Sequence, residues 1–225
     1  GYSDIAVGTA ELLDIDLMTN FKSPYFSASI REFWSRWHIS LSTWFRDYVY
    51  IPLGGNRRGP WRTRWNLLVT FLVSGLWHGA SWTYVLWGGI HGLGQILERE
   101  WMRIFHMDPK KKSWLRIGVT FLFVMVTWIF FRADTISDAF YVLTHLLEGI
   151  TNPAAYLTDG YHAFQGSGMV KASGVQTLII SIVCILVLLA HDYLELTKSI
   201  WERIGAFKKP LRYALYFFLL FVILY

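Results

Sequence analysis

The residue best suited to chemistry in this sequence is His78, which stands in the run Gly-Leu-Trp-His-Gly-Ala. A largely apolar segment, residues 67–76, precedes it, and a second one begins at Trp82. Histidine changes its charge near neutral pH, and an ionisable group between membrane-like segments usually has a function. A neutral imidazole here could take the proton from a hydroxyl that attacks an activated acyl group. His78 is therefore our first candidate, although a histidine that only bonds a neighbouring helix would look the same locally.

Two other histidines are weaker candidates. His38 follows Trp37 at the border between the apolar and polar faces of an expected helix, and His91 follows two glycines and could face the same cavity as His78. For each of them, a hydrogen-bonded core histidine is the commoner explanation. No two of the seven histidines have the HxxxH spacing of metal ligands, so we predict no metal site. With the single Cys184, the chain can form neither an internal disulfide nor a thiolate cluster.

The elements that position these histidines should lie in a membrane, because 54% of the residues are hydrophobic and only 16% are charged. Lysine and arginine occur in blocks between apolar segments, as positive-inside sorting predicts, so the net charge of +5 does not indicate a nucleic-acid partner. The chain starts without methionine and ends within an apolar run, and we expect it to be the C-terminal fragment of a longer membrane protein.

Apolar length and loop charge predict an all-α, polytopic architecture. Residues 114–131 would span about 27 Å as a helix, and residues 175–190 and 213–225 are similar, the last cut short or tilted. The basic connections 98–116 and 192–212 should be cytoplasmic, whereas the acidic stretch 132–174 should face the outside. In that stretch we expect an amphipathic helix over residues 139–150 and a loop over residues 156–174.

Two segments beside the candidate histidines are unusual. Residues 67–76 form only about half of a membrane span, so with a second helix over residues 82–97 they predict a re-entrant pair or a broken helix at His78. The glycines of the helix over residues 82–97 would allow close contact between the two helices. Ser29 followed by Glu32 fits a capping box, so we expect one amphipathic helix across residues 27–51, lying at the interface or against other helices.

Several motifs together resemble the membrane-bound O-acyltransferase family, and its bacterial alginate O-acetyltransferase branch most closely. The resemblance covers nearly the first half of the chain strongly and the rest only by hydropathy. Its motifs are Asn20-Phe21, Ser23-Pro24-Tyr25, IREFWSRWHISLSTWFRDYVYIPLGGNRRG from Ile30 to Gly59, and SGLWHGASWTYVLWGGIHG from Ser74 to Gly92.

The resemblance implies one acyltransferase domain over residues 1–225, lacking N-terminal helices, in a multi-pass protein of the bacterial inner membrane. His78 matches the family's Trp-His-Gly histidine, usually taken as the active site, and His38 matches its second histidine motif. Arg46 and Asp47 match an Arg-Asp pair, for which we expect a buried structural ion pair. The resemblance further implies membrane lipid around the protein, acetyl-CoA as the acyl donor with no resident cofactor, and an extracytoplasmic partner protein that passes the acetyl group to a polysaccharide.

Two alternatives remain open from the sequence. A transporter or channel component could also use a broken helix and membrane histidines to conduct protons or solutes. An acyltransferase could instead act on a lipid, a peptidoglycan sugar or a teichoic-acid carrier, because acceptor choice depends on the outer mouth and on parts beyond this chain.

Overall fold

The computed structural model describes residues 2–108, 111–146 and 174–224, and these residues form helices and connections without a strand. The predicted all-α class is confirmed. The chain divides into two compact units, Gly1–Gly174 and Val175–Tyr225, which are described separately. His78 and His38 both lie in the first unit.

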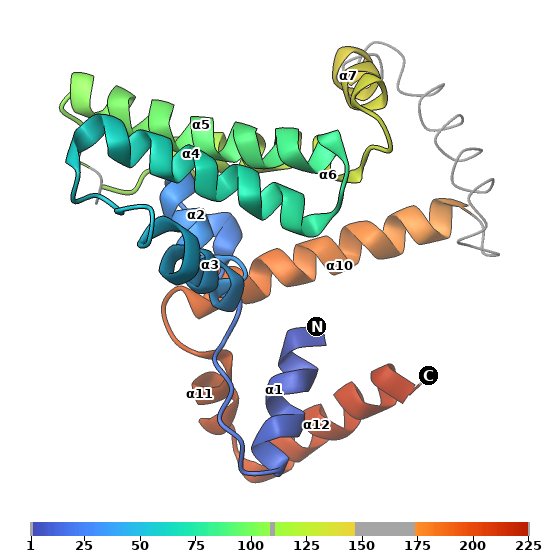
Figure 1. Ribbon diagram of the computed structural model, residues 1–225. Helices are drawn as coiled ribbons and strands as arrows, with labels where there is room; N and C mark the ends of the chain where they lie inside the picture. Colours follow the sequence, from blue (N-terminus) through green and yellow to red (C-terminus); the bar gives the residue numbers. More distant parts are fainter. Residues whose placement is uncertain (1, 109–110, 147–173, 225) are drawn as a thin grey trace. The chain divides into compact units, whose positions relative to one another are not determined.

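A helical hairpin is the centre of the first unit. It consists of α4 (Gly59–His78) and α5 (Trp82–Ile104), which lie side by side in Figure 1. The break between them at residues 79–81 is confirmed, and Gly79 there is extended. The half-length helix over residues 67–76 was wrong, however, because α4 has 20 residues and measures about 30 Å.

The extra turns of α4 come from the basic segment that precedes residues 67–76. Pro60 suits the first turn of a helix, where its missing N–H leaves no hydrogen bond unmade. Arg64, in the next turn, forms an ion pair with Glu100 of α5, with 2.6 Å between Nη2 and Oε1. A long arginine side chain paired in this way can extend a helix past its apolar part.

Glycines let the two helices of the hairpin approach closely, as predicted. A Cβ atom on Gly88 would collide with the carbonyl oxygen of Phe71, and one on Gly75 would collide with the carbonyl oxygen of Tyr84. A Cβ atom on Gly94, on the same helix as Gly88, would instead collide with the Phe123 ring, which belongs to the helix over residues 114–132. These contacts fix the register of α4 against α5 and hence the place of His78.

The helix expected across residues 27–51 is broken, so that prediction was wrong. Its place is taken by α2 (Ile30–Arg36), α3 (Ile39–Phe45) and the π-helical turn η2 (Arg46–Tyr50). The break falls at His38, whose φ of 45° and ψ of 56° lie in the left-handed region. The N-cap of α2 is as expected, since Ser29 Oγ accepts a hydrogen bond from the Glu32 amide at 3.0 Å. The Glu32 carboxylate, however, accepts from the Ala28 amide instead of that of Ser29, so the capping box is only half formed.

The remaining helices of the first unit follow the predictions in part. The helix α6 (Trp114–Arg132) matches the predicted span, and among the described residues it is the one helix long and apolar enough to cross a membrane. The amphipathic helix α7 (Ile136–His145) starts three residues before the expected segment 139–150. The end of that segment and the expected loop 156–174 lie outside the described residues, except for Gly174, which is the first residue of a helix. The unit also contains α1 (Tyr2–Leu12) and the short η1 (Pro24–Phe26).

The second unit contains α10 (Gly174–Glu195), α11 (Ile200–Gly205) and α12 (Lys209–Leu224). The expected helices 175–190 and 213–225 are thus present, with slightly different ends. That they cross a membrane stays a prediction, as does the single domain over residues 1–225.

Candidate active site

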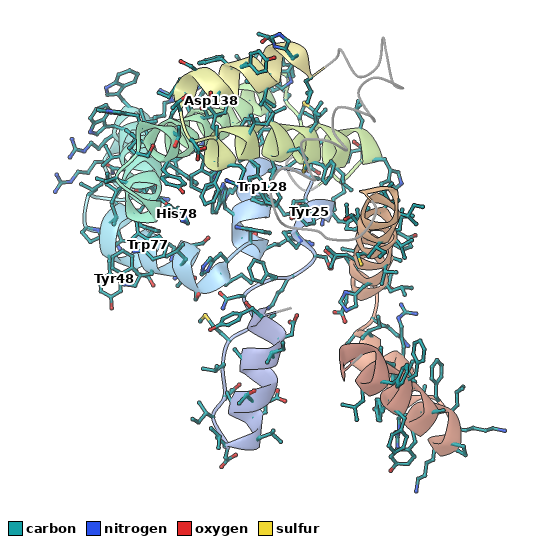
Figure 2. The ribbon with its side chains drawn as sticks, turned by 90° about the vertical axis from the view of Figure 1, so that its right-hand side faces the viewer. Tyr25, Tyr48, Trp77, His78, Trp128 and Asp138 are labelled. Carbon is teal, nitrogen blue, oxygen red and sulfur yellow. The ribbon has the colours of Figure 1, made fainter. Side chains whose placement is uncertain are left out.

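His78 is the last residue of α4 and lies among aromatic rings from three helices. Its ring is edge-on to those of Trp77, Trp87 and Phe131, with centroids 5.0 to 5.2 Å apart, and the Tyr84 ring is 6.4 Å away. Figure 2 labels His78 and Trp77 at this end of the hairpin. The side chain is half-buried, and no group in the described part of the chain forms a hydrogen bond with its ring nitrogens. Both nitrogens are therefore available to a substrate.

Gly79 shapes the chain directly after His78. A Cβ atom at this position would lie 2.7 Å from the ring of Tyr84, so a larger residue would displace that ring. Tyr84 also stands edge-on to Phe131, with 5.0 Å between centroids. The helix break thus brings aromatic surface against one side of His78, and such surface keeps water away from a reacting group.

His38 lies near His78, so the structure brings the two sequence candidates together. The two side chains are close enough for a charge on one to act on the other. The Nδ1 atom of His38 is 3.5 Å from Ser40 Oγ, and its ring lies 6.1 Å from that of Phe21. A left-handed backbone is costly for a residue other than glycine and occurs often at functional sites.

His91 has no free nitrogen to offer a substrate. It is fully buried, and its Nδ1 accepts a hydrogen bond from the Trp34 indole at 3.2 Å. Its Nε2 lies 3.0 Å from Thr127 Oγ1, and the Thr127 hydroxyl donates to the Val124 carbonyl at 2.7 Å. His91 Nε2 must therefore be the donor to Thr127. This chain of hydrogen bonds links α2, α5 and α6, so we interpret His91 as a structural residue.

Trp87 is a residue of the site that the sequence did not point out. It is buried, and its indole N–H has no hydrogen-bond partner among the described residues. Its ring contacts those of both His78 and His91. Nothing in the sequence distinguishes Trp87 from the other eleven tryptophans. Its environment arises only when α4, α5 and α6 pack together.

The Arg46–Asp47 pair forms as expected but is not buried, so that part of the prediction was wrong. The Arg46 side chain is 59% exposed and that of Asp47 is 41% exposed, with 2.7 Å between Nε and Oδ1. The two residues are neighbours in the π-helical turn η2. In the described ranges no three histidine, cysteine or acidic side chains gather as a metal site would require.

These features define a helical protein with a membrane-length helix and two histidines placed at helix breaks. Residues 2–135, more than half of the chain, match the membrane-bound O-acyltransferase family. The chain therefore belongs to the membrane-bound O-acyltransferase family, as its motifs predicted.

Individual relatives agree with the family match. The probable alginate O-acetylase AlgI of Azotobacter vinelandii is 51% identical over 62% of this chain and 28% of its own length. The peptidoglycan O-acetyltransferase of Helicobacter pylori is 44% identical over 67% of this chain and 29% of its own length. The teichoic acid D-alanyltransferase of Streptococcus thermophilus is 33% identical over 58% of this chain and 37% of its own length. The chain thus spans well under half the length of these relatives.

Proposed function

We propose that the whole protein is a multi-pass O-acyltransferase of the bacterial inner membrane that moves an acetyl group from acetyl-CoA toward an extracytoplasmic polysaccharide. An extracytoplasmic partner protein would hand the group to the polymer. Family membership supports acyl transfer, and the identity to alginate O-acetylases supports an acetyl group and a polysaccharide. The donor needs no resident cofactor beside it, because the thioester is already an activated acyl group.

In the proposed reaction His78 is the general base. Its neutral imidazole accepts the proton of the acceptor hydroxyl while the hydroxyl oxygen attacks the thioester carbonyl carbon. A carbon–oxygen bond forms and the carbon–sulfur bond breaks. The imidazolium then returns its proton to the departing CoA thiolate, so His78 ends the cycle neutral.

One observation supports this role most strongly, namely that the ring nitrogens of His78 have no protein partner in the described part of the chain although the side chain is half-buried. A histidine that only holds helices together has its nitrogens bonded within the protein, as His91 does, whereas those of His78 are left accessible to a substrate.

The test is to replace His78 with glutamine or alanine in the complete protein. General-base catalysis contributes roughly 10²- to 10⁴-fold, so acetylation should fall at least that far. Expression and melting temperature should stay near those of the unchanged protein, since no hydrogen bond is lost. Unchanged acetyl content in the polymer would show that His78 is not the base.

Topology offers a second test, because a charged donor has to stay on the cytoplasmic side. We expect Lys111 and Lys208 to be cytoplasmic and Asp159, which lies outside the described residues, to face the outside. Single cysteines are placed at these positions in a Cys184→Ala background, because Cys184 is exposed. They should differ in their reactivity toward an impermeant maleimide in intact cells. Only the cysteine at position 159 should react. Labelling at 111 but not at 159 would invert the topology.

A peptidoglycan sugar is the second candidate acceptor, supported by the 44% identity to the Helicobacter pylori enzyme. Purified complete protein incubated with radiolabelled acetyl-CoA and either polymer, with the partner protein present, separates the two acceptors. Consumption of the thioester in the same assay also separates an acyltransferase from a transporter or channel.

A further inference from the structure

The first turn of α3 begins without a hydrogen bond from its own N-cap residue. That residue is His38, whose side chain makes no capping hydrogen bond. The first amides of a helix have no partner inside the helix and are usually capped by the preceding side chain. At His38 such a cap would tie up the imidazole.

Asn20, which is distant in sequence, supplies the missing acceptors. Its backbone carbonyl accepts a hydrogen bond from the Ile39 amide at 3.0 Å. Its side-chain Oδ1 accepts one from the Ser40 amide at 3.0 Å and one from the Ser40 hydroxyl at 2.6 Å. Three donors around the break thus end on one residue.

The segment that contains Asn20 also binds the end of α2, on the other side of the break. The Lys22 amide donates to the Arg36 carbonyl at 3.0 Å, at the last residue of α2. The segment from Asn20 to Lys22 therefore holds α2 and α3 apart at Trp37 and His38. These bonds oppose relaxation of His38 out of its left-handed conformation, which is sparsely populated for a residue other than glycine.

Ser40 extends this arrangement to the imidazole itself. Its hydroxyl hydrogen is directed to Asn20 Oδ1, which leaves the hydroxyl oxygen as an acceptor 3.5 Å from His38 Nδ1. A hydrogen on Nδ1 is favoured by that oxygen, and the lone pair of the neutral ring is then on Nε2.

From this geometry we propose that Asn20 is a positioning residue for His38 and sets the direction and tautomer of its imidazole through Ser40. The inference rests on the proposed acyl transfer and adds His38 to it as a residue that assists His78. Asn20 itself touches no reacting atom.

The test compares Asn20→Ala with Asn20→Asp in the complete protein, each alone and combined with His38→Gln. Asn20→Ala should lower kcat about tenfold with little change in KM, because the substrate contacts are intact. Aspartate keeps both side-chain acceptor positions and should restore kcat to within about twofold. When His38 is already glutamine, Asn20→Ala should cause no further loss of kcat, since it acts only through His38.

Ser29→Ala is the matched control, because it removes a helix cap from α2 at the end away from His38. It should lower the melting temperature without changing kcat. If Asn20→Ala does not fold, Ser40→Ala keeps the amide bond to Asn20 and should show a smaller loss of kcat that also disappears in the His38→Gln background.

Three results would overturn the inference. In the first, the factors by which Asn20→Ala and His38→Gln lower kcat multiply in the double variant. In the second, Asn20→Ala lowers only the melting temperature, as Ser29→Ala does. In the third, His38→Gln leaves kcat unchanged. Full acetylation by His78→Gln is a separate result, which would instead refute the proposed base.

Discussion

His78 and His91 lie on the two helices of one hairpin and contact the same tryptophan, yet their surroundings are opposite. His91 is fully buried with both ring nitrogens hydrogen-bonded, whereas His78 is half-buried without a partner among the described residues. Burial alone would have favoured His91 as the special residue. The state of the nitrogens instead separates a histidine that holds helices together from one that is available for chemistry.

Replacing His91 with leucine should give the largest loss of stability. The Trp34 indole N–H would lose its acceptor inside the protein, which costs about 1–3 kcal/mol, and the replaced ring adds a packing cost. His78→Leu should change the melting temperature little, because no hydrogen bond is lost. Thermal unfolding of both variants in one detergent checks this contrast.

A double variant sharpens that comparison. Trp34→Phe removes the donor, so Trp34→Phe with His91→Leu should cost less than the sum of the two single changes. Equal melting temperatures for His78→Leu and His91→Leu would contradict the distinction between the two histidines.

Gly88→Ala should have the next largest effect, because it attacks the packing that holds both histidines. The new Cβ atom would collide with the Phe71 carbonyl oxygen of α4, and backbone can move aside only by separating the helices. Overpacking of this kind costs about 1–3 kcal/mol. Activity should fall with stability, as measured by acetyl transfer and thermal unfolding.

Gly118→Ala, on α6, is the matched control for that change. Nothing lies within 4 Å of a Cβ atom there, and alanine favours a helix by up to about 1 kcal/mol over glycine. The variant should be as stable as the unchanged protein or slightly more so. A Gly88→Ala protein that behaves like this control would show that close hairpin packing is not needed.

The smallest expected effect concerns Glu32, which anchors the helix that carries Trp34. Its carboxylate contacts Lys112 at 2.6 Å and Arg36 at 2.8 Å. Burial works to raise the Glu32 pKa, but hydrogen bonds from Lys112 and the Ala28 amide outweigh it and lower the pKa below its ordinary 4.5. Partly exposed ion pairs contribute little, so Glu32→Gln should cost less than about 1 kcal/mol near neutral pH.

The pH dependence of that small effect has a definite sign. A carboxyl group whose pKa is lowered by folding stabilises the folded state above its unfolded pKa, here about 4.5, and loses this as pH falls through the folded pKa. The stability difference between the unchanged protein and Glu32→Gln should therefore shrink on acidification. A difference that grows as pH falls would contradict the assignment.

Sequence reasoning located α6 and the break at His78 because both depend on local apolar length and on glycine. It failed at the start of α4, because the expected helix began only at residue 67, after the charged Arg64. The ion pair with Glu100, 36 positions away, makes that charge compatible with the helix. Local hydropathy contains no information about such a pair.

The break at His38 was missed for the same kind of reason. The apolar period of residues 27–51 continues through it, and the residue that caps α3 is Asn20, which precedes the segment. The role of His91 likewise depends on Trp34 and Thr127, which lie on two other helices. Family motifs identified the two candidate histidines, whereas their different hydrogen bonding followed only from tertiary packing.

The hydrogen bonds through His91 have a fixed direction, and this bears on proton conduction. An indole nitrogen can only donate and a backbone carbonyl can only accept, so the chain from Trp34 through His91 and Thr127 to Val124 runs one way. A proton wire must reverse every bond after each passage before it can carry another proton. Since both ends of this chain forbid reversal, these hydrogen bonds between α2, α5 and α6 do not relay protons, while the ring nitrogens of His78 stay open to chemistry.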